Sequence, residues 1–425
     1  MQMRLPLSLL SLVSVLAHTT LLAGDWPQWR GPNRDGLAPD RPTLTALPKE
    51  LKPTWRLDIG PGHAAPVIAG NQLVVLALTE GKETAHALDA ATGKELWRRA
   101  YDANPADFSN FGAGPRCAPL IDGDRVYVQS GRGEFQCLAL ADGKPRWGFS
   151  FEREFGATWF GNKGNDPAAK ETASRRHGNN GSPVIDGDRI FVAVGDPAGA
   201  TLVCFDKLTG KKHWQVGTDN TAYASLMVGT LAGVRQVVHF TADALMGVEA
   251  ATGKLLWRVP IKTGAKRHTV TPILHGDSVV VSSHSVGMMR FDLQKTGGEV
   301  KAVQAWANKD VATMLCTPVL VGGHLYALGT TRGTKSEFVC VDFTTGKLLW
   351  SQPGFEDYAS VIAVGDKLLA LNSTGELFLL RANPKHYEEL GRMQATGKTW
   401  SHPAYVNGRL YLRDSRQLMS VELAK

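Results

Sequence analysis

The chain has 425 residues, of which 43% are apolar and 20% charged, so it can bury a large core and lacks the composition of a disordered protein. Its net charge of +7 is spread along the chain and forms no run, which argues against a nucleic-acid partner. Internal repeats must be considered before length is converted into a number of domains.

The N-terminus has the pattern of an export signal. Arg4 precedes an apolar stretch, residues 5–17, that is too short to span a bilayer comfortably. We therefore predict that residues 1–24 are a cleavable signal peptide and that the protein is periplasmic or secreted, with a retained N-terminal anchor as the alternative. Asp25 occupies the place where a lipoprotein signal needs a cysteine, so lipidation is not expected. No later segment is apolar enough to cross a membrane.

One phrase recurs along the rest of the chain: an acidic residue, two residues, Thr-Gly-Lys, two residues, Trp. It occurs at Asp89–Trp97, Asp206–Trp214, Glu249–Trp257 and Asp342–Trp350, with a looser copy at Ala139–Trp147. The Thr-Gly-Lys step is typical of a hairpin turn, because glycine tolerates a positive φ. The acidic residue is expected to hydrogen-bond its own turn.

A second phrase precedes each of these copies. It consists of a small residue, Pro, two apolar residues, a Gly turn and an alternating apolar run, as in Ala118–Val128 and Ser182–Val192. Two apolar runs joined by Asp-Gly indicate a β-hairpin, and alternation with period two excludes a helical repeat. Each repeat therefore predicts four strands, A to D, joined by tight turns.

In seven repeats an aromatic residue early in strand D marks the repeat and should pack between neighbouring units. In the eighth, degenerate copy the equivalent position is Leu390. After it, the chain has room only for strands A to C, beginning near Trp400, whereas Pro53–Leu57 is a D strand with nothing before it. The marked tryptophans are Trp55, Trp97, Trp147, Trp214, Trp257, Trp306 and Trp350.

These two incomplete ends should complete one another. We predict an all-β, eight-bladed β-propeller of four-stranded antiparallel blades, closed by N- and C-terminal strands that share one blade. The expected boundaries are an N-terminal extension at 25–52 and a propeller at 53–425. A seven-bladed ring would require the irregular copy at Thr269–Trp306, or the one containing Asn383-Pro384, to be an insertion.

The repeated Asp-x-x-Thr-Gly-Lys-x-x-Trp phrase resembles the pyrroloquinoline quinone (PQQ)-type repeat of quinoprotein alcohol dehydrogenases and of BamB-like propellers. The resemblance covers roughly residues 53–425. Residues 25–36, Asp-Trp-Pro-Gln-Trp-Arg-Gly-Pro-Asn-Arg-Asp-Gly, are similar to the start of many exported PQQ-binding-like propeller proteins of largely unassigned function. Such a repeat specifies a fold far better than a function.

Quinoprotein dehydrogenases resemble one another in having adjacent cysteines at the cofactor, a Ca²⁺ ion and a catalytic aspartate. This chain has no adjacent cysteine pair and no Cys-x-x-Cys-His haem motif. The Asp-Gly-Asp triplets at 122–124 and 186–188 fall at A–B turns, so a turn explains them better than Ca²⁺ does. We predict no metal, no catalytic residue and no cofactor, with PQQ as the alternative.

The five cysteines stand at equivalent positions of the repeat and are expected to be small buried fillers. Two lie just before strand A and three lie on strand C. They are Cys117 and Cys316, and Cys137, Cys204 and Cys340, respectively.

One repeat position does not look structural. Three residues before the strand-A proline, where the chain enters the central channel, most copies carry a large polar or aromatic side chain. We interpret this position as a candidate binding ring at the mouth of the channel, against the alternative of ordinary loop packing. The ring comprises His63, Arg116, Asn180, Tyr223, Tyr358 and Trp400, with Thr269 and Leu315 at the two other positions.

The longest insertion, Glu152–Asn179, lies beside this ring. Long loops with aromatic and arginine residues are often functional and commonly anchor partners. The candidate binding residues in it are Phe155, Trp159, Phe160, Arg175, Arg176 and His177. The loops Lys266–His268 and Asn308–Asp310 should lie on the same face, because they also join strand D to strand A.

We therefore predict a non-catalytic, exported binding or scaffold propeller that contacts a protein or an extended, anionic ligand at this face. We expect it to be a monomer. A PQQ-dependent dehydrogenase and a carbohydrate-binding or lyase-type propeller are the alternatives. Nucleic acid is not an expected partner.

Overall fold

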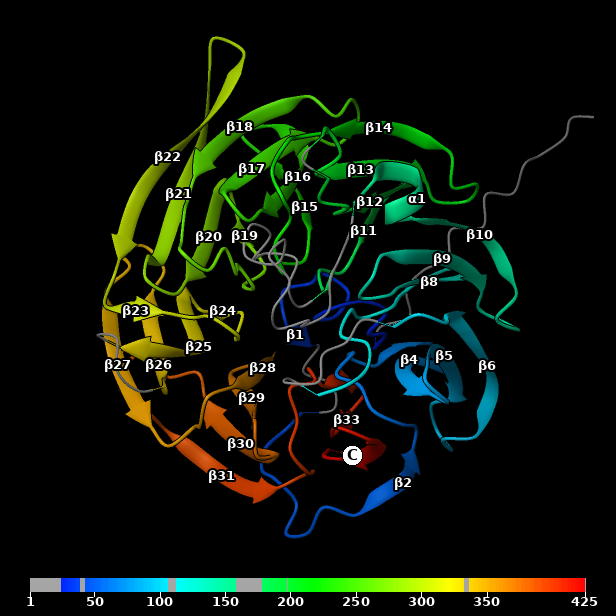
Figure 1. Ribbon diagram of the computed structural model, residues 1–425. Coiled ribbons are helices and arrows are strands. Elements are labelled where there is room, and N and C mark those ends of the chain that lie inside the picture. Colours follow the sequence, from blue (N-terminus) through cyan, green and yellow to red (C-terminus); the bar gives the residue numbers. More distant parts are fainter. Residues whose placement is uncertain are drawn as a thin grey trace, which may run out of the picture.

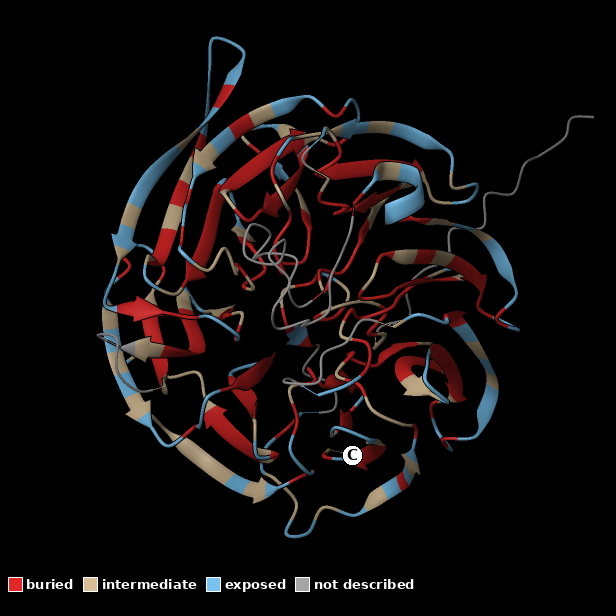
Figure 2. Ribbon diagram, viewed as in Figure 1, coloured by how far each residue is buried: buried red, intermediate tan, exposed pale blue. Residues whose placement is uncertain are grey.

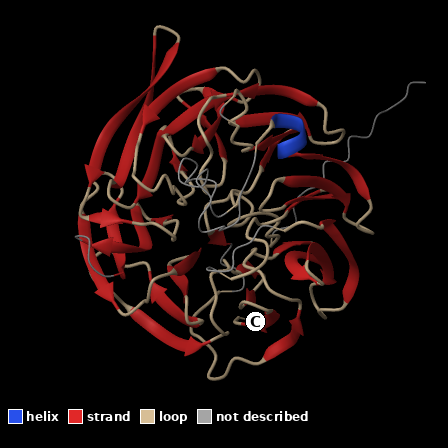
Figure 3. Cartoon of the chain, viewed as in Figure 1, coloured by secondary structure: helices blue, strands red, loops and turns tan. Residues whose placement is uncertain are grey.

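A computed structural model describes residues 24–38, 43–105, 112–157, 178–196, 198–331 and 336–424. Strands dominate, and the helix in the described part is the single short α1 (Phe151–Phe155) (Figure 3). No helix of the described residues is long and apolar enough to cross a membrane. The predicted signal, residues 1–24, lies almost wholly outside the described part of the chain.

Eight four-stranded antiparallel sheets are arranged as blades around a central axis, which confirms the predicted eight-bladed propeller (Figure 1). Blade 1 consists of β3 (Val67–Ala69), β4 (Gln72–Thr79), β5 (Lys82–Asp89) and β6 (Glu95–Asp102), and blade 2 of β7 (Leu120–Asp122), β8 (Arg125–Gln129), β9 (Glu134–Ala139) and β10 (Pro145–Ser150). Blade 3 consists of β11 (Val184–Asp186), β12 (Arg189–Val192), β13 (Leu202–Asp206) and β14 (Lys212–Val216), and blade 4 of β15 (Met227–Leu231), β16 (Val234–Phe240), β17 (Ala244–Glu249) and β18 (Leu255–Pro260).

Blades 5 to 8 follow the same order from the centre outwards. Blade 5 consists of β19 (Ile273–His275), β20 (Ser278–Ser283), β21 (Gly287–Thr296) and β22 (Glu299–Asn308), and blade 6 of β24 (Val319–Val321), β25 (His324–Thr331), β26 (Ser336–Asp342) and β27 (Leu348–Pro353). Blade 7 consists of β28 (Ala359–Val364), β29 (Lys367–Asn372), β30 (Glu376–Arg381) and β31 (Glu389–Gln394), and blade 8 of β32 (Ala404–Val406), β33 (Arg409–Arg413), β34 (Gln417–Glu422) and β2 (Pro53–Asp58). Two short strands, β1 (Leu37–Ala38) and β23 (Val311–Ala312), add to blades 7 and 6.

The burial of each strand follows its place in the blade. The inner strands are covered on both faces by neighbouring blades, whereas the outermost strands largely alternate between partly buried and exposed residues (Figure 2). This is why the first three strands of a repeat are nearly continuous apolar runs and the fourth, such as β27, alternates.

The repeat tryptophans pack between blades, as predicted. Trp97 of blade 1 donates from Nε1 to the carbonyl of Leu140 in blade 2 at 2.7 Å, and its ring lies over Gly143, where a Cβ would come within 2.6 Å of it. Gly143 has a φ of 70°. The turn glycine is therefore required twice, for its backbone conformation and for the space that the indole occupies.

The same bond is formed by five further tryptophans, each to a backbone carbonyl of the next blade. Trp257 instead donates to Gln236 Oε1 within its own blade at 2.6 Å. In the next blade the residue that corresponds to Leu140 is Leu293, which lies inside the long β21–β22 hairpin, opposite Ala302. The five carbonyl acceptors belong to Ala90, Lys207, Ala250, Phe343 and Asn383, for Trp55, Trp147, Trp214, Trp306 and Trp350.

The turn aspartates also act as predicted. Asp206 Oδ1 accepts hydrogen bonds from the backbone N–H and the hydroxyl of Thr209, both at 2.7 Å. Asp89 and Asp342 do the same with Thr92 and Thr345. These bonds lower the pKa of each carboxyl group.

The ring closes in blade 8, where β2 from the N-terminal part pairs antiparallel with β34 from the C-terminus, with Trp55 opposite Ser420. Arg413 on β33 secures this closure against blade 1. Its guanidinium is buried and donates to the carbonyls of Leu76 at 2.8 Å and Gly60 at 3.2 Å. In a closed ring every blade packs against a blade on each side, so no blade face is left exposed to solvent as it would be at the ends of an open row of blades.

The segment 24–38 lies inside the ring, and its last two residues form β1 near the centre of the ring (Figure 1). Trp26 exchanges backbone hydrogen bonds with Ile68 of blade 1 at 2.8 and 2.9 Å, and Pro27 accepts one from Ile121 of blade 2 at 2.8 Å. At its other end Leu37 pairs in parallel with Ala363 of blade 7. The segment therefore bonds blades 1, 2 and 7 from inside the ring.

Candidate functional site

The main candidate site is a cavity of about 290 Å³ on the propeller axis. All eight residues at the predicted ring position line it, one from each blade: His63, Arg116, Asn180, Tyr223, Thr269, Leu315, Tyr358 and Trp400. The structure thus brings together residues that are far apart in the sequence. That they bind a ligand stays a prediction.

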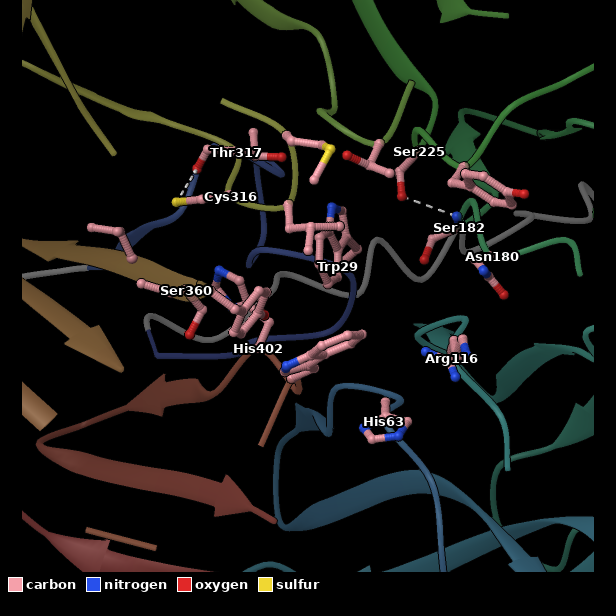
Figure 4. Close-up of a pocket in the computed structure, with 18 of the residues that line it drawn as sticks. Trp29, His63, Arg116, Asn180, Ser182, Ser225, Cys316, Thr317, Ser360 and His402 are labelled. Atoms are coloured by element: carbon pink, nitrogen blue, oxygen red, sulfur yellow. Dashed lines mark hydrogen bonds between the residues drawn. The ribbon is translucent and has the colours of Figure 1, made fainter. Parts of the chain in front are cut away.

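One side of the cavity carries hydrogen-bond donors. His63, Arg116 and Asn180 come from the consecutive blades 1, 2 and 3 and lie along the same side (Figure 4). Arg116 Nη2 donates to the carbonyl of Gly112 at 3.1 Å, which orients its guanidinium. A second arginine, Arg267, lines the cavity outside this donor side, from the loop that leads into blade 5, next to blade 6.

The opposite side is apolar and aromatic. Met314 and Leu315 of blade 6 are 42% and 37% exposed at the cavity. Tyr358 of blade 7 and Trp400 of blade 8 follow, with ring centroids 6.3 Å apart. His63 lies 6.3 Å beyond Trp400, so the aromatic run ends where the donor side begins.

Trp29, from the segment inside the ring, forms the floor and lies between the two sides (Figure 4). Its Nε1 donates to Thr271 Oγ1 at 3.2 Å, and its ring meets His402 edge-on at a centroid distance of 5.2 Å. Hydroxyl groups surround this floor at the position two residues after the ring residue in the repeat. The ones that line the cavity belong to Ser182, Ser225, Thr317 and Ser360.

The residues beneath the floor hold it rigidly. Arg30 donates from Nη2 to the carbonyls of Pro318 at 2.7 Å and Asp35 at 3.0 Å. Arg34 donates to the carbonyls of Pro183 at 2.8 Å and Ser182 at 3.2 Å. Burial lowers the pKa of Arg30 to about 10 and that of Arg34 to about 9, so both stay charged at neutral pH.

The electrostatics of the cavity favour anions. Burial lowers the pKa of Arg116 to about 10, which still leaves it charged at neutral pH. Burial, together with the nearby charge of Arg30, lowers the pKa of His402 to about 3, so this imidazole is neutral. Among the described residues that line the cavity, none is Asp or Glu. A cation-lined, partly apolar cavity attracts a ligand with both negative charge and apolar surface.

No metal site is built by the described residues, among which no group of three or more His, Cys, Asp or Glu could hold an ion. The Asp-Gly-Asp triplets form turns, as predicted, and Asp122 pairs with Lys207 at 2.6 Å. All five cysteines are free and buried, which confirms their predicted structural role. Burial raises the pKa of each thiol, to about 12 for Cys117 and about 11 for Cys316, so they are poor nucleophiles.

The insertion contributes little that can be placed. Phe155 lies in α1 and packs on Phe149 and Phe205, with centroid distances of 5.9 and 6.3 Å, away from the cavity lining. Trp159, Phe160, Arg175, Arg176 and His177 lie outside the described residues. Of the two other loops expected on this face, Lys266–His268 supplies Arg267, whereas no residue of Asn308–Asp310 lines the cavity.

The sequence interpretation missed Trp29, Met314 and the hydroxyl positions. The hydroxyl positions had a signal, because five consecutive repeats carry Ser or Thr two residues after the ring position. Trp29 had none within the repeat, since it belongs to the segment that precedes the first blade.

The family described as outer membrane protein assembly factor BamB matches residues 37–114 and 81–352. An uncharacterized protein of Rickettsia conorii is 22% identical over 273 residues, which cover 61% of this chain and 58% of that protein. The outer membrane protein assembly factor BamB of Xanthomonas campestris is 26% identical over 223 residues, which cover 50% of this chain and 46% of that protein. The match therefore spans about half the length of these curated relatives.

Solved structures show the same fold. BamB of Moraxella catarrhalis superimposes with a TM-score of 0.59 at 15% identity, covering 88% of this chain and 98% of that one. A quinohemoprotein alcohol dehydrogenase of Pseudomonas putida gives a TM-score of 0.64 at 11% identity, covering 94% of this chain and 80% of that one. At such identities the likeness concerns the fold alone. Because the family match extends over well more than half of the sequence, this chain belongs to the BamB-type family of PQQ-like β-propellers.

Proposed function

We propose that this protein is a non-catalytic, exported binding propeller that holds an anionic segment of a partner in its axial cavity. The observation that carries the proposal is the cavity lining: each of the eight blades contributes a side chain, two arginines face the space, and no described lining residue is acidic. A site assembled from every blade on a rigid ring is preorganised, so little is lost in ordering it on binding.

Two further points support a binding role. The relatives include an outer membrane protein assembly factor, a name that refers to assembly and to no reaction. The described residues supply no metal cluster and no activated thiol. The envelope location rests on the predicted signal at residues 1–24 and on the charge pattern of that segment.

Calorimetric titration of the purified protein with peptide pools tests the proposal. The pools have equal length and free termini and differ only in net charge. We expect the acidic pool to bind more tightly than the other pools, and its binding to weaken as salt is raised, because part of the attraction is Coulombic. Arg116→Ala and Arg267→Ala should each weaken it. Arg98→Ala, which removes a charge that is 57% exposed on the outer strand β6, is the matched control.

The result that would contradict the proposal is binding of no pool, or binding that both cavity variants leave intact. A quinone-dependent dehydrogenase is the competing function, since one structural relative is a quinohemoprotein. The described lining does not fit that chemistry: it offers no carboxylate to hold Ca²⁺, and Cys117 and Cys316 are buried in different blades. Adding PQQ and Ca²⁺ and recording the absorption spectrum checks this directly.

A further inference from the structure

The cavity is closed on the side of the A–B turns. The segment 24–38 crosses the axis there and is bonded to opposite parts of the ring: Trp26 to blade 1, Arg34 to blade 3, Arg30 to blade 6 and Leu37 to blade 7. A polypeptide therefore cannot pass through the propeller along its axis. Within the part of the chain that the structure describes, the entrance lies on the other side, where Met314 and Leu315 are exposed.

The two sides of the cavity differ in chemistry and face each other. In a closed ring of eight blades, blade 2 lies opposite blade 6, so Arg116 lies across the cavity from Leu315. His63 and Asn180 flank Arg116 from blades 1 and 3, whereas Tyr358 follows Leu315 in blade 7. A ligand that satisfies both sides carries a compact anion at one end and an apolar group directly beside it.

We propose that the cavity receives the C-terminus of a polypeptide, with its terminal carboxylate at Arg116 and its last, apolar side chain against Leu315. This deepens the proposed function and rests on it. The α-carboxylate and the last side chain of a peptide branch from one carbon atom, so they can point to opposite walls of the cavity. A planar guanidinium can match a carboxylate with two parallel hydrogen bonds, and His63 and Asn180 flank Arg116 on the cavity wall.

An internal acidic residue would fit less well. The chain on both sides of it would have to enter and leave a cavity of about 290 Å³ with one closed end. The backbone N–H and C=O groups of both strands would then need partners inside it, and unpaired buried backbone groups are costly. A chain end brings one strand only.

Calorimetric titration with matched hexapeptides tests this inference. The first pair ends in Ala-Leu and differs only in a free carboxylate or an amide at the C-terminus; the second pair ends in Ala-Leu or Ala-Ser, both with free carboxylates. We expect amidation to weaken binding by at least about tenfold, because a charge-assisted hydrogen-bonded pair is lost. Replacing Leu by Ser should weaken it several-fold, because apolar contact is lost.

Variants locate the two contacts. Arg116→Gln should abolish the difference between the acid and the amide, and Arg116→Lys should retain part of it, because Lys keeps the charge but not the planar fork. Leu315→Gln should abolish the difference between Leu and Ser endings. Leu349→Gln on the outer strand β27, at the same 37% exposure, is the matched control and should change neither. Circular dichroism confirms that the variants are folded.

The outcomes separate this inference from the proposed function. If amide and acid bind equally while Arg116→Gln still weakens both, the cavity binds anions or polar groups but not chain ends, and this inference is overturned. If no peptide binds in a way that depends on Arg116, both fail. If the acid is preferred and the preference disappears in Arg116→Gln, the C-terminus is the ligand.

Discussion

The outer turns of the blades and the axial cavity are built from the same repeat but differ in how far its copies agree. At the outer turns the copies are nearly interchangeable: an aspartate bonds its threonine, a glycine makes room, and a tryptophan bonds the next blade. At the cavity the copies place differing side chains at the same position. Positions at which the copies agree therefore stabilise the ring, whereas positions at which they differ give the cavity its particular chemistry.

The largest test of this comparison is the replacement of tryptophans in the two regions. Trp97→Ala removes an interblade indole and its bond to Leu140, and it should lower the free energy of unfolding by about 3–5 kcal/mol. Trp400→Ala, at the cavity wall, should lower it by less than about 2 kcal/mol but reduce peptide affinity. Denaturant titration and calorimetry measure the two effects; equal losses of stability would contradict the division.

The closure of the ring offers a second contrast, between a buried and an exposed arginine of blade 8. Arg413→Ala leaves the carbonyls of Leu76 and Gly60 unpaired inside the protein and should cost about 3 kcal/mol. Arg416→Ala removes a surface ion pair with Asp58, at 3.1 Å, and should cost less than about 1 kcal/mol. Unfolding in guanidinium chloride should show a lower midpoint for Arg413→Ala than for Arg416→Ala. The reverse order would be evidence against the role of Arg413 in closure.

A buried acid between blades 1 and 2 predicts a pH dependence. Burial raises the pKa of Glu83 to about 7, even though it accepts a hydrogen bond from Tyr101 at 2.7 Å; Asp102 raises it further and Arg132 opposes it. Since the folded pKa exceeds the unfolded value, stability falls as pH rises from about 4.5 through 7. Glu83→Gln should flatten this fall by about 1–3 kcal/mol, with Glu154→Gln on the exposed face of α1 as the control. Thermal unfolding between pH 5 and 8 provides the measurement; parallel curves for wild type and variant would contradict it.

The smallest expected effect concerns a single outer turn. Asp206→Ala removes two hydrogen bonds from one of the repeated turns and should cost about 1 kcal/mol without affecting peptide binding. Because the hydrogen bonds lower the pKa of Asp206, this stabilisation is present above the unfolded pKa and is lost as pH falls through the folded one. Denaturant titration at pH 7 and pH 3 checks both parts. A variant whose deficit is the same at both pH values would contradict the assignment to the carboxylate.

The fold was open to prediction because its determinants are local and repeated. The turn from Asp206 to Gly210 and the tryptophan that follows it can be recognised in a short window, and the incomplete strands at the two ends imply that β2 and β34 meet. The residues of the candidate binding ring could also be predicted, by aligning the copies of the repeat on the proline of strand A. This alignment assigns His63 and Trp400 to one ring although they belong to opposite ends of the chain, and their ring centroids lie 6.3 Å apart.

The floor of the cavity could not be predicted in this way. Nothing in the repeat indicates that Trp29 reaches Thr271 across more than two hundred residues of sequence, or that Arg30 and Arg34 bond carbonyls of blades 6 and 3. These contacts depend on the width of the finished channel. That width exists only after all eight blades have closed.

The sequence by itself determined the blade, the number of blades and the closure, because hairpin turns and alternating apolar residues act over a few residues and repeat eight times. Tertiary structure alone decided that the N-terminal segment closes the channel and that the donor side faces the apolar side. The physical reason is that opposition across an axis is a property of the closed ring, to which residues from distant repeats contribute only once the ring has formed.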